Sequence, residues 1–205
     1  MEIPPFHDEA MALEQAWHNN IKPQPLSASK ELVTQIATSL RFLPEEMEDP
    51  LLQLPWFSWK KRHTLLRYRV SIHAMLWYWA LREVVAERAY PLLQTVQPIY
   101  SANLGKRMPS WRQIMIDMDF FQTILDNYRE EGFLSVAQHV IWRVHGDFTQ
   151  DLNLLEIAVA LSFYMDHVFE ECRIRVHHWA GRTPTMGVDR LTGLLDDEAF
   201  SGNWT

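Results

Sequence analysis

The chain has 205 residues and a formal net charge of −7, with 47 % hydrophobic and 22 % charged residues. This length suits one domain that buries a substantial core. Nucleic acid is a poor partner for such a chain, because nucleic-acid binding gains most of its affinity by neutralising phosphates. Cys172 is the single cysteine, which excludes an internal disulfide and a zinc site built from several cysteines. A lone cysteine also fits a reducing compartment, so we expect a cytoplasmic protein.

Neither the start of the chain nor its apolar windows predict a membrane association. Met1–Asp8 includes acids and two prolines, and lacks the positive region and long apolar stretch of a signal peptide. The two most apolar windows are Val70–Leu81 and Leu154–Phe169. Both are shorter than the ~20 apolar residues of a membrane span, and Glu156 and Asp166 interrupt the second. We interpret both windows as helices that protein covers on nearly every side.

The first part of the chain predicts two helices and a connector. The spacing of apolar residues indicates one helix at about Asp8–His18 and a second that begins at Ser27 or Ser29, either of which can cap it. The buried face of the second helix is expected to comprise Leu32, Ile36, Leu40 and Leu43. Pro44–Pro55, acidic and then apolar, follows as a connector on the surface.

A long helix is predicted next, with Ser58 as its cap. We expect it to end at about Arg88 or Tyr90, because Pro91 follows and cannot continue a helix. Pro91 and Pro98 then bracket a short segment that can continue at a kink.

The second half of the chain predicts three more helices. Ser110 caps the first, and Gly132 is expected to end it. Its apolar seam comprises Trp111, Ile114, Met118, Phe121, Leu125 and Tyr128. The second is predicted at Phe133–His145, and the third at Leu152–Ala180 with Asp151 as its cap.

These elements predict an all-α fold without strands. Short connections between helices favour antiparallel neighbours, so we expect a single-domain antiparallel bundle of about six helices with two central apolar helices. The bundle is predicted to span residues 1–182, and residues 183–205 a loosely packed tail.

No motif for catalysis, metal binding or nucleotide binding stands out. Glu-x-x-His, His-Glu-x-x-His, Gly-x-Ser-x-Gly and glycine-rich phosphate loops are all absent. Cys172 follows Glu171, and a neighbouring carboxylate raises a thiol pKa, so we interpret it as a structural thiol. We therefore assign no catalytic residue, no metal ligand and no cofactor.

A metal-dependent enzyme is nevertheless one alternative, because histidines and carboxylates occur on several predicted helices. His167 and Glu171 lie one helical turn apart, as two ligands would. The residues whose convergence would create such an iron or manganese site are His73, His139, Asp166, His167 and Glu171. The stronger interpretation is an ordinary ion-paired face, since Glu170 and Glu171 precede Arg173 and Arg175 at helical spacing.

The surface charge then becomes the best guide to function. Acidic residues concentrate before residue 58, beside aromatic residues that can anchor a partner. The predicted partner-binding residues are Glu45, Glu46, Glu48, Asp49, Trp56 and Trp59. The basic cluster that follows Trp59 could bind phosphate, but the acidic run before it can neutralise it within the molecule.

The function that we rank first is a non-enzymatic, acidic module that binds a basic protein partner. An inhibitor of the immunity-protein or antitoxin type would have this character, since such proteins are often small, acidic and without a catalytic motif. The metal-dependent enzyme is the first alternative. The second is a helical regulatory or scaffold subunit that dimerises through the seam of Trp111–Tyr128, although that seam is better interpreted as part of the core. The pattern does not indicate an oligomeric state.

Overall fold

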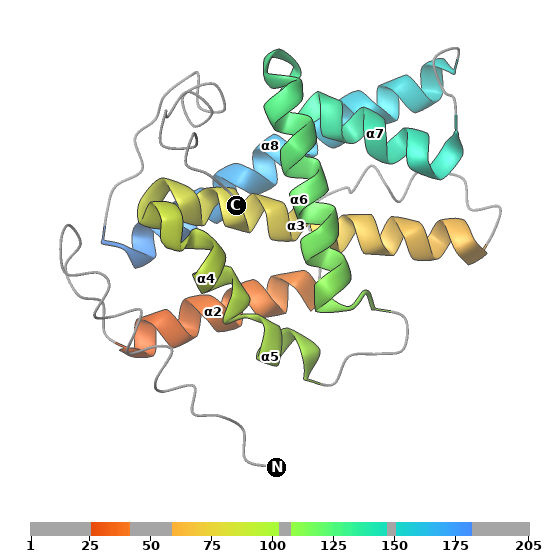
Figure 1. Cartoon of the computed structure of the whole chain (residues 1–205). Coiled ribbons are helices and arrows are strands. Elements are labelled where there is room, and N and C mark those ends of the chain that lie inside the picture. The colour runs from red at the N-terminus through yellow and green to blue at the C-terminus, as the bar shows by residue number, and fades with distance from the viewer. Residues whose placement is uncertain (1–25, 42–58, 103–107, 147–150, 182–205) are drawn as a thin grey trace, which may run out of the picture.

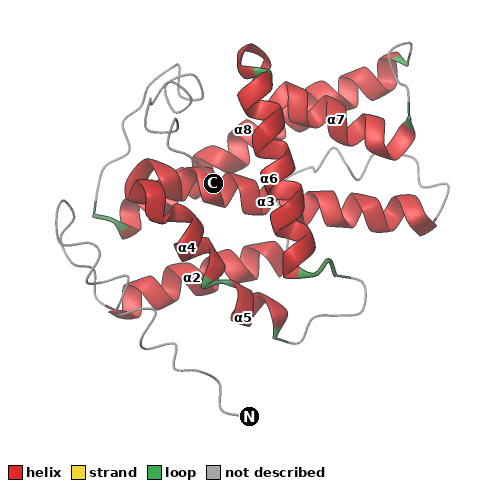
Figure 2. Ribbon diagram, in the orientation of Figure 1, coloured by secondary structure: helices red, strands yellow, loops and turns green. Residues whose placement is uncertain are grey.

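The computed structural model describes residues 26–41, 59–102, 108–146 and 151–181, and every regular element in these ranges is a helix (Figures 1 and 2). The all-α prediction is therefore confirmed. The predicted helix at Asp8–His18, the connector Pro44–Pro55 and the tail over 183–205 lie outside the described residues. The antiparallel arrangement of six helices and the domain limits stay predictions.

Helix α2 (Leu26–Arg41) contributes one face to the core. Leu32, Ile36 and Leu40 recur every four residues, so they lie on one side of the helix, and all three are buried. The predicted buried face is thus confirmed for these three residues, and Leu43 lies outside the described residues.

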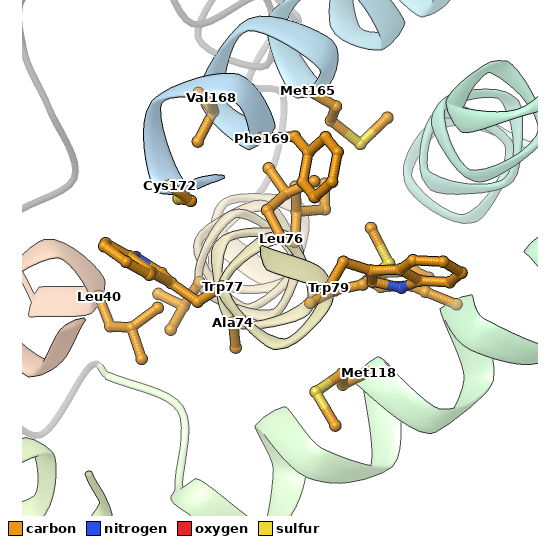
Figure 3. Close-up of a cluster of buried hydrophobic side chains, with 14 of the residues drawn as sticks. Leu40, Ala74, Leu76, Trp77, Trp79, Met118, Met165, Val168, Phe169 and Cys172 are labelled. Carbon is orange, nitrogen blue, oxygen red and sulfur yellow. The ribbon is translucent and has the colours of Figure 1, made fainter. Parts of the chain in front are cut away.

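Helix α3 (Trp59–Val85) runs through the middle of the molecule (Figure 1). It contacts α2, α4, α6, α7 and α8, so its central window Val70–Leu81 is buried apart from the partly exposed Tyr78. Figure 3 shows Trp77 and Trp79 pointing to opposite sides of this helix. Trp77 Nε1 donates a hydrogen bond to Ser39 Oγ of α2 at 2.7 Å. The prediction that this helix is covered on nearly every side is confirmed.

The end of α3 differs from the prediction. The helix ends at Val85, before Arg88, and a 3-10 turn, η2 (Ala86–Arg88), separates it from α4 (Ala89–Gln94). Pro91 has no backbone N–H, and its ring would clash with the carbonyl four residues earlier in a continuous helix. The chain therefore turns ahead of the proline, with Ala86 at a φ of 49°, and Pro91 occupies the first turn of α4.

Short helices and a capped long helix follow. Helix α5 (Gln97–Ser101) begins with Pro98 in its first turn. Helix α6 (Trp111–Asn127) begins as predicted, because Ser110 Oγ accepts a hydrogen bond from the Gln113 N–H at 3.3 Å. The buried members of its predicted seam are Trp111, Ile114, Met118, Phe121 and Leu125, whereas Tyr128 is exposed.

The prediction that Gly132 ends α6 is wrong. The helix ends at Asn127, and the chain tightens into a second 3-10 turn, η3 (Arg129–Glu131). Gly132, at a φ of 55°, instead turns the chain into α7 (Phe133–His145), whose bounds agree with the prediction.

A buried carboxylate fixes α6 against α3. Asp117 of α6 is almost fully buried and accepts hydrogen bonds from both the Nε and an Nη of Arg67, the former at 2.6 Å, and from Ser71 Oγ at 3.1 Å. The hydrogen bond to Asp117 raises the pKa of Arg67. Because a displaced α6 would leave this carboxylate buried without donors, the contact selects one register of the two helices.

Helix α8 (Leu152–Trp179) begins at Asp151, as predicted. Asp151 Oδ1 accepts hydrogen bonds from the backbone N–H groups of Asn153 and Leu154, at 3.0 and 3.3 Å. One side of α8 lies against α3 and α7. His73 Nε2 of α3 meets Tyr164 Oη of α8 at 2.9 Å inside the core, and burial lowers the pKa of His73 to about 3.

The far end of the α3–α8 contact is polar. Arg173 of α8 is 2 % exposed and donates to both carboxylate oxygens of Glu170, at 2.9 and 2.8 Å. Its Nη1 lies 3.7 Å from Glu83 of α3, which also meets His177 Nε2 at 3.0 Å. These contacts tie the last turns of α3 and α8 together.

Candidate functional site

The predicted partner-binding residues are not tested by the structure. Glu45, Glu46, Glu48, Asp49 and Trp56 lie outside the described residues, and Trp59 is the first residue of α3 with its side chain undescribed. Their role stays a prediction.

The residues considered for a metal site are not brought together. His73 is buried against Tyr164, and His139 of α7 lies between the rings of Phe120 and Trp142. The remaining three, Asp166, His167 and Glu171, are exposed on α8, where Glu171 pairs with Arg175 at 3.4 Å. Among the described residues, no group of three or more His, Cys, Asp or Glu side chains is placed to hold a metal ion.

The side of α8 that faces away from α3 is apolar and exposed. Leu152 is 74 % exposed and Phe163 68 %, and Val159 between them is also exposed. These residues follow one another at seven and four positions, so they lie along one face of the helix. We define the outer face of α8 by the exposed and partly exposed residues Leu152, Leu155, Glu156, Val159, Ala160, Phe163 and Asp166.

This outer face corrects the prediction that α8 is covered on nearly every side. The helix is buried where it meets α3 and α7, but no described element lies over Val159 and Phe163. By length and hydropathy α8 is also the one described helix that could cross a membrane, and 39 % of that apolar window is buried inside the molecule. A core helix of a soluble protein passes the same test, so this property does not by itself assign a membrane role.

The outer face is hollowed between its large side chains. An open hollow of about 400 Å³ is lined by Leu152, Leu155, Glu156, Val159, Ala160 and Phe163. Every lining residue belongs to α8, and all but Glu156 are apolar. The hollow can therefore receive apolar side chains from outside the described residues.

Two carboxylates on the outer face have no ion-pair partner among the described residues. Glu156 lines the hollow itself, and Asp166 lies three residues beyond Phe163. Loss of solvent around its carboxyl raises the pKa of Asp166. Their neighbours Glu170 and Glu171 differ, since each is held by an arginine of the same helix. The outer face thus combines an apolar hollow with negative charge that no described cation neutralises.

A second exposed apolar group lies where α6 meets α7, and it is organised differently. Phe120 of α6 lies 4.7 Å from His139, which lies 5.6 Å from Trp142, as measured between ring centroids. The guanidinium of Arg143 lies over the Trp142 ring at 5.9 Å. These side chains therefore cover one another, whereas the exposed side chains of α8 surround an open hollow.

The helical phase of the charged residues in the α8 window is a sequence signal for the outer face, although the prediction did not use it. From the sequence alone, Glu156 is interpreted as an interruption of an apolar window, and Asp166 as an interruption and as a metal-site candidate. Their phase is more informative, because Glu156 shares its helix face with Leu152, Val159 and Phe163. A charged residue in phase with large apolar residues indicates a face that is not enclosed by the core.

Comparisons with models of protein families, with curated proteins and with solved structures gave no match.

Proposed function

We propose that this protein is a non-enzymatic module that binds a basic protein partner, and that the outer face of α8 is its binding surface. The observation that carries the proposal is the exposed apolar hollow together with the carboxylates of Glu156 and Asp166, for which the described residues supply no ion-pair partner. Interfaces take most of their affinity from a few residues, often aromatic ones, and the exposed ring of Phe163 is suited to this role. Complementary charge at the rim speeds association with a cationic partner.

The charge of the whole chain supports the same proposal. A net charge of −7 attracts a basic protein over a distance of about one Debye length, ~10 Å at moderate salt. The acidic run Glu45–Asp49 would add to this attraction. An inhibitor that occupies the functional surface of a basic toxin or nuclease is the specific form that we propose, acting in the cytoplasm, where a lone and buried Cys172 stays reduced.

The two alternatives have less support. The five metal-site candidates do not converge on one site, since His73 and His139 lie elsewhere in the fold than the three on α8. The seam of α6 is buried within the chain apart from Tyr128, which supports its role as part of the core over a role in dimerisation. We therefore propose neither an enzyme nor a scaffold subunit.

A cross-linking experiment identifies the partner and tests the surface together. Phe163 is replaced by the photoreactive analogue p-benzoylphenylalanine in the full chain, and the cross-linked protein is identified by mass spectrometry. The control carries the same analogue at Tyr90, an exposed aromatic residue of α4. Association of the purified partner is then measured as a function of salt.

The proposal expects one basic protein, cross-linked from position 163 and much more weakly from position 90. Its association rate constant should fall at least about tenfold between roughly 50 and 500 mM salt. A neutral or acidic partner, a rate that does not respond to salt, or equal cross-linking from both positions would contradict the proposal.

A further inference from the structure

The lining residues of the hollow have the arrangement of a helix-packing surface. Leu152, Leu155, Glu156 and Val159 are related by steps of three, four and seven residues. Four residues so related enclose a single hole on a helix, into which one side chain of a facing helix fits. The first hole on α8 is therefore complete and open to solvent.

A second hole follows directly. Glu156, Val159, Ala160 and Phe163 repeat the same relation four residues further along. The two holes lie one helical turn apart, a rise of about 6 Å. Two side chains at positions i and i+4 of another helix have this separation. Alternate residues of a strand are spaced similarly, at ~6.6 Å, but a strand presents a straighter and flatter surface than a helix does.

The carboxylates specify the charge of the facing helix. Glu156 borders both holes, and neither it nor Asp166 has an ion-pair partner among the described residues. A lysine or arginine beside the two apolar side chains would pair with Glu156, and another one turn away would pair with Asp166. A second copy of this chain does not satisfy this requirement, because two outer faces would bring like charges together.

The position of Asp166 also favours one direction. Asp166 lies between the hollow and the C-terminus of α8. At the N-terminal end of the hollow the nearest carboxylate is that of Asp151, which already accepts hydrogen bonds from backbone N–H groups. The N-terminus of a helix carries partial positive charge, so a facing helix gains by placing that end over Asp166. This orientation is antiparallel to α8.

We propose that the outer face of α8 receives an amphipathic, cationic helix of the protein partner, antiparallel to α8, with apolar side chains i and i+4 in the two holes. This inference rests on the proposed function and specifies the partner's contacting segment. It fits the recognition mode in which an amphipathic helix lays its apolar face into a groove.

Synthetic peptides test the inference on the full chain. The probe is an alanine-based peptide of about four helical turns, with leucines at i and i+4 and lysines in its N-terminal turn and beside the leucines. A scrambled peptide has the same composition without the helical phase, and a third peptide carries the terminal lysines at its C-terminal end. Binding is measured by fluorescence anisotropy, and helix formation by circular dichroism.

The phased peptide should bind at least about tenfold more tightly than the scrambled one and become helical on binding. It should also bind about threefold more tightly than the peptide with C-terminal lysines. Phe163→Ala and Glu156→Lys should each weaken binding by about tenfold or more. The matched controls, Trp142→Ala on α7 and Glu130→Lys in η3, should change it less than about twofold. A peptide in which only the lysines beside the leucines are replaced by glutamates, with the N-terminal lysines kept for Asp166, should recover binding to the E156K variant.

Several results would overturn the inference. Equal binding of phased and scrambled peptides excludes a helix, and equal binding of the two charge placements excludes the antiparallel direction. Co-sedimentation with phosphatidylcholine vesicles that Phe163→Ala abolishes would identify a lipid surface as the occupant. A concentration-dependent dimer in sedimentation that the same substitution abolishes would identify a second copy.

The failure of the proposed function gives a different pattern. If the protein cross-linked from position 163 is basic but contacts α8 through a loop or strand, the proposed function stands and the helix inference fails. If no basic protein is cross-linked at that position and the phased peptide does not bind, both fail.

Discussion

Helices α3 and α8 are alike in length and apolar content but differ in their surroundings. They comprise 27 and 28 residues. α3 is enclosed by five other helices, and its apolar residues from Leu65 to Val85 are buried or packed against the core. α8 contacts the rest of the chain on one side, and its other side leaves Leu152, Val159 and Phe163 exposed. The comparison shows that the hydropathy of a helix indicates only that it can be buried. Which of its faces are buried depends on the helices that pack against it.

The largest expected effect contrasts one aromatic residue from each helix. Trp77→Ala in α3 should lower the free energy of unfolding by about 3–5 kcal/mol, because it removes a buried ring and leaves a cavity. Phe163→Ala in α8 should change it by less than about 0.5 kcal/mol, because that ring is exposed. Urea unfolding of both variants measures the difference. Equal losses would mean that Phe163 is covered and that the contrast between the helices is wrong.

A pH-dependent effect is expected where the two helices meet. His73 has a folded-state pKa of about 3 against 6.5 in the unfolded chain, so between these values the unfolded state binds more protons. Its contribution to stability is complete above pH 6.5 and decreases as the pH falls, by up to about 1.4 kcal/mol per pH unit. Measured by urea unfolding at several pH values, His73→Phe should be less sensitive to acid than the wild type. The exposed His167 of α8 offers the control, since His167→Gln should retain the wild-type slope.

A smaller effect distinguishes the two sides of α3. Trp77 Nε1 donates to Ser39 Oγ, whereas the buried Nε1 of Trp79 has no hydrogen-bond partner among the described residues. Replacement by phenylalanine removes a similar ring area at both positions, but it breaks a hydrogen bond only at Trp77. We expect Trp77→Phe to destabilise the protein by about 1 kcal/mol more than Trp79→Phe in thermal unfolding. The reverse order would show that the Trp79 indole has a partner outside the described residues.

The smallest effect concerns an exposed ion pair of α8. Arg175 and Glu171 are both about half exposed and 3.4 Å apart. A double-mutant cycle of Arg175→Gln and Glu171→Gln should give a coupling free energy of no more than about 0.5 kcal/mol, further reduced by salt. A coupling above about 1 kcal/mol would mean that this part of α8 is shielded from solvent.

Local signals predicted much of the fold, because they act between residues close in the chain. Ser110 and Asp151 begin their helices with the expected caps, and glycines bound α7. The sequence does not predict the early end of α3, because this end depends on a positive φ at Ala86. Alanine rarely adopts a positive φ, so its presence does not indicate a turn. Pro91 predicts that the helix ends in the turn before it, but it does not determine at which residue the chain bends.

The candidate site was harder to predict because it depends on which neighbours are absent from one face. Periodicity alone places Leu152, Val159 and Phe163 on one stripe, but it does not tell whether another helix covers that stripe. Contacts between residues far apart in the chain could not be predicted either. His73 and Tyr164 are 91 residues apart, and nothing in either local sequence indicates the other.

The dependence of α3 on α8 has a consequence for synthesis of the protein. Tyr164 leaves the ribosome 91 residues after His73, which at about 5–20 residues per second is a delay of roughly 5–20 seconds. During that interval the apolar centre of α3 has emerged without one of the helices that shield it from water. A nascent chain that stalls before Leu152 is therefore a substrate for chaperones and proteases, whereas the completed chain has enclosed this segment.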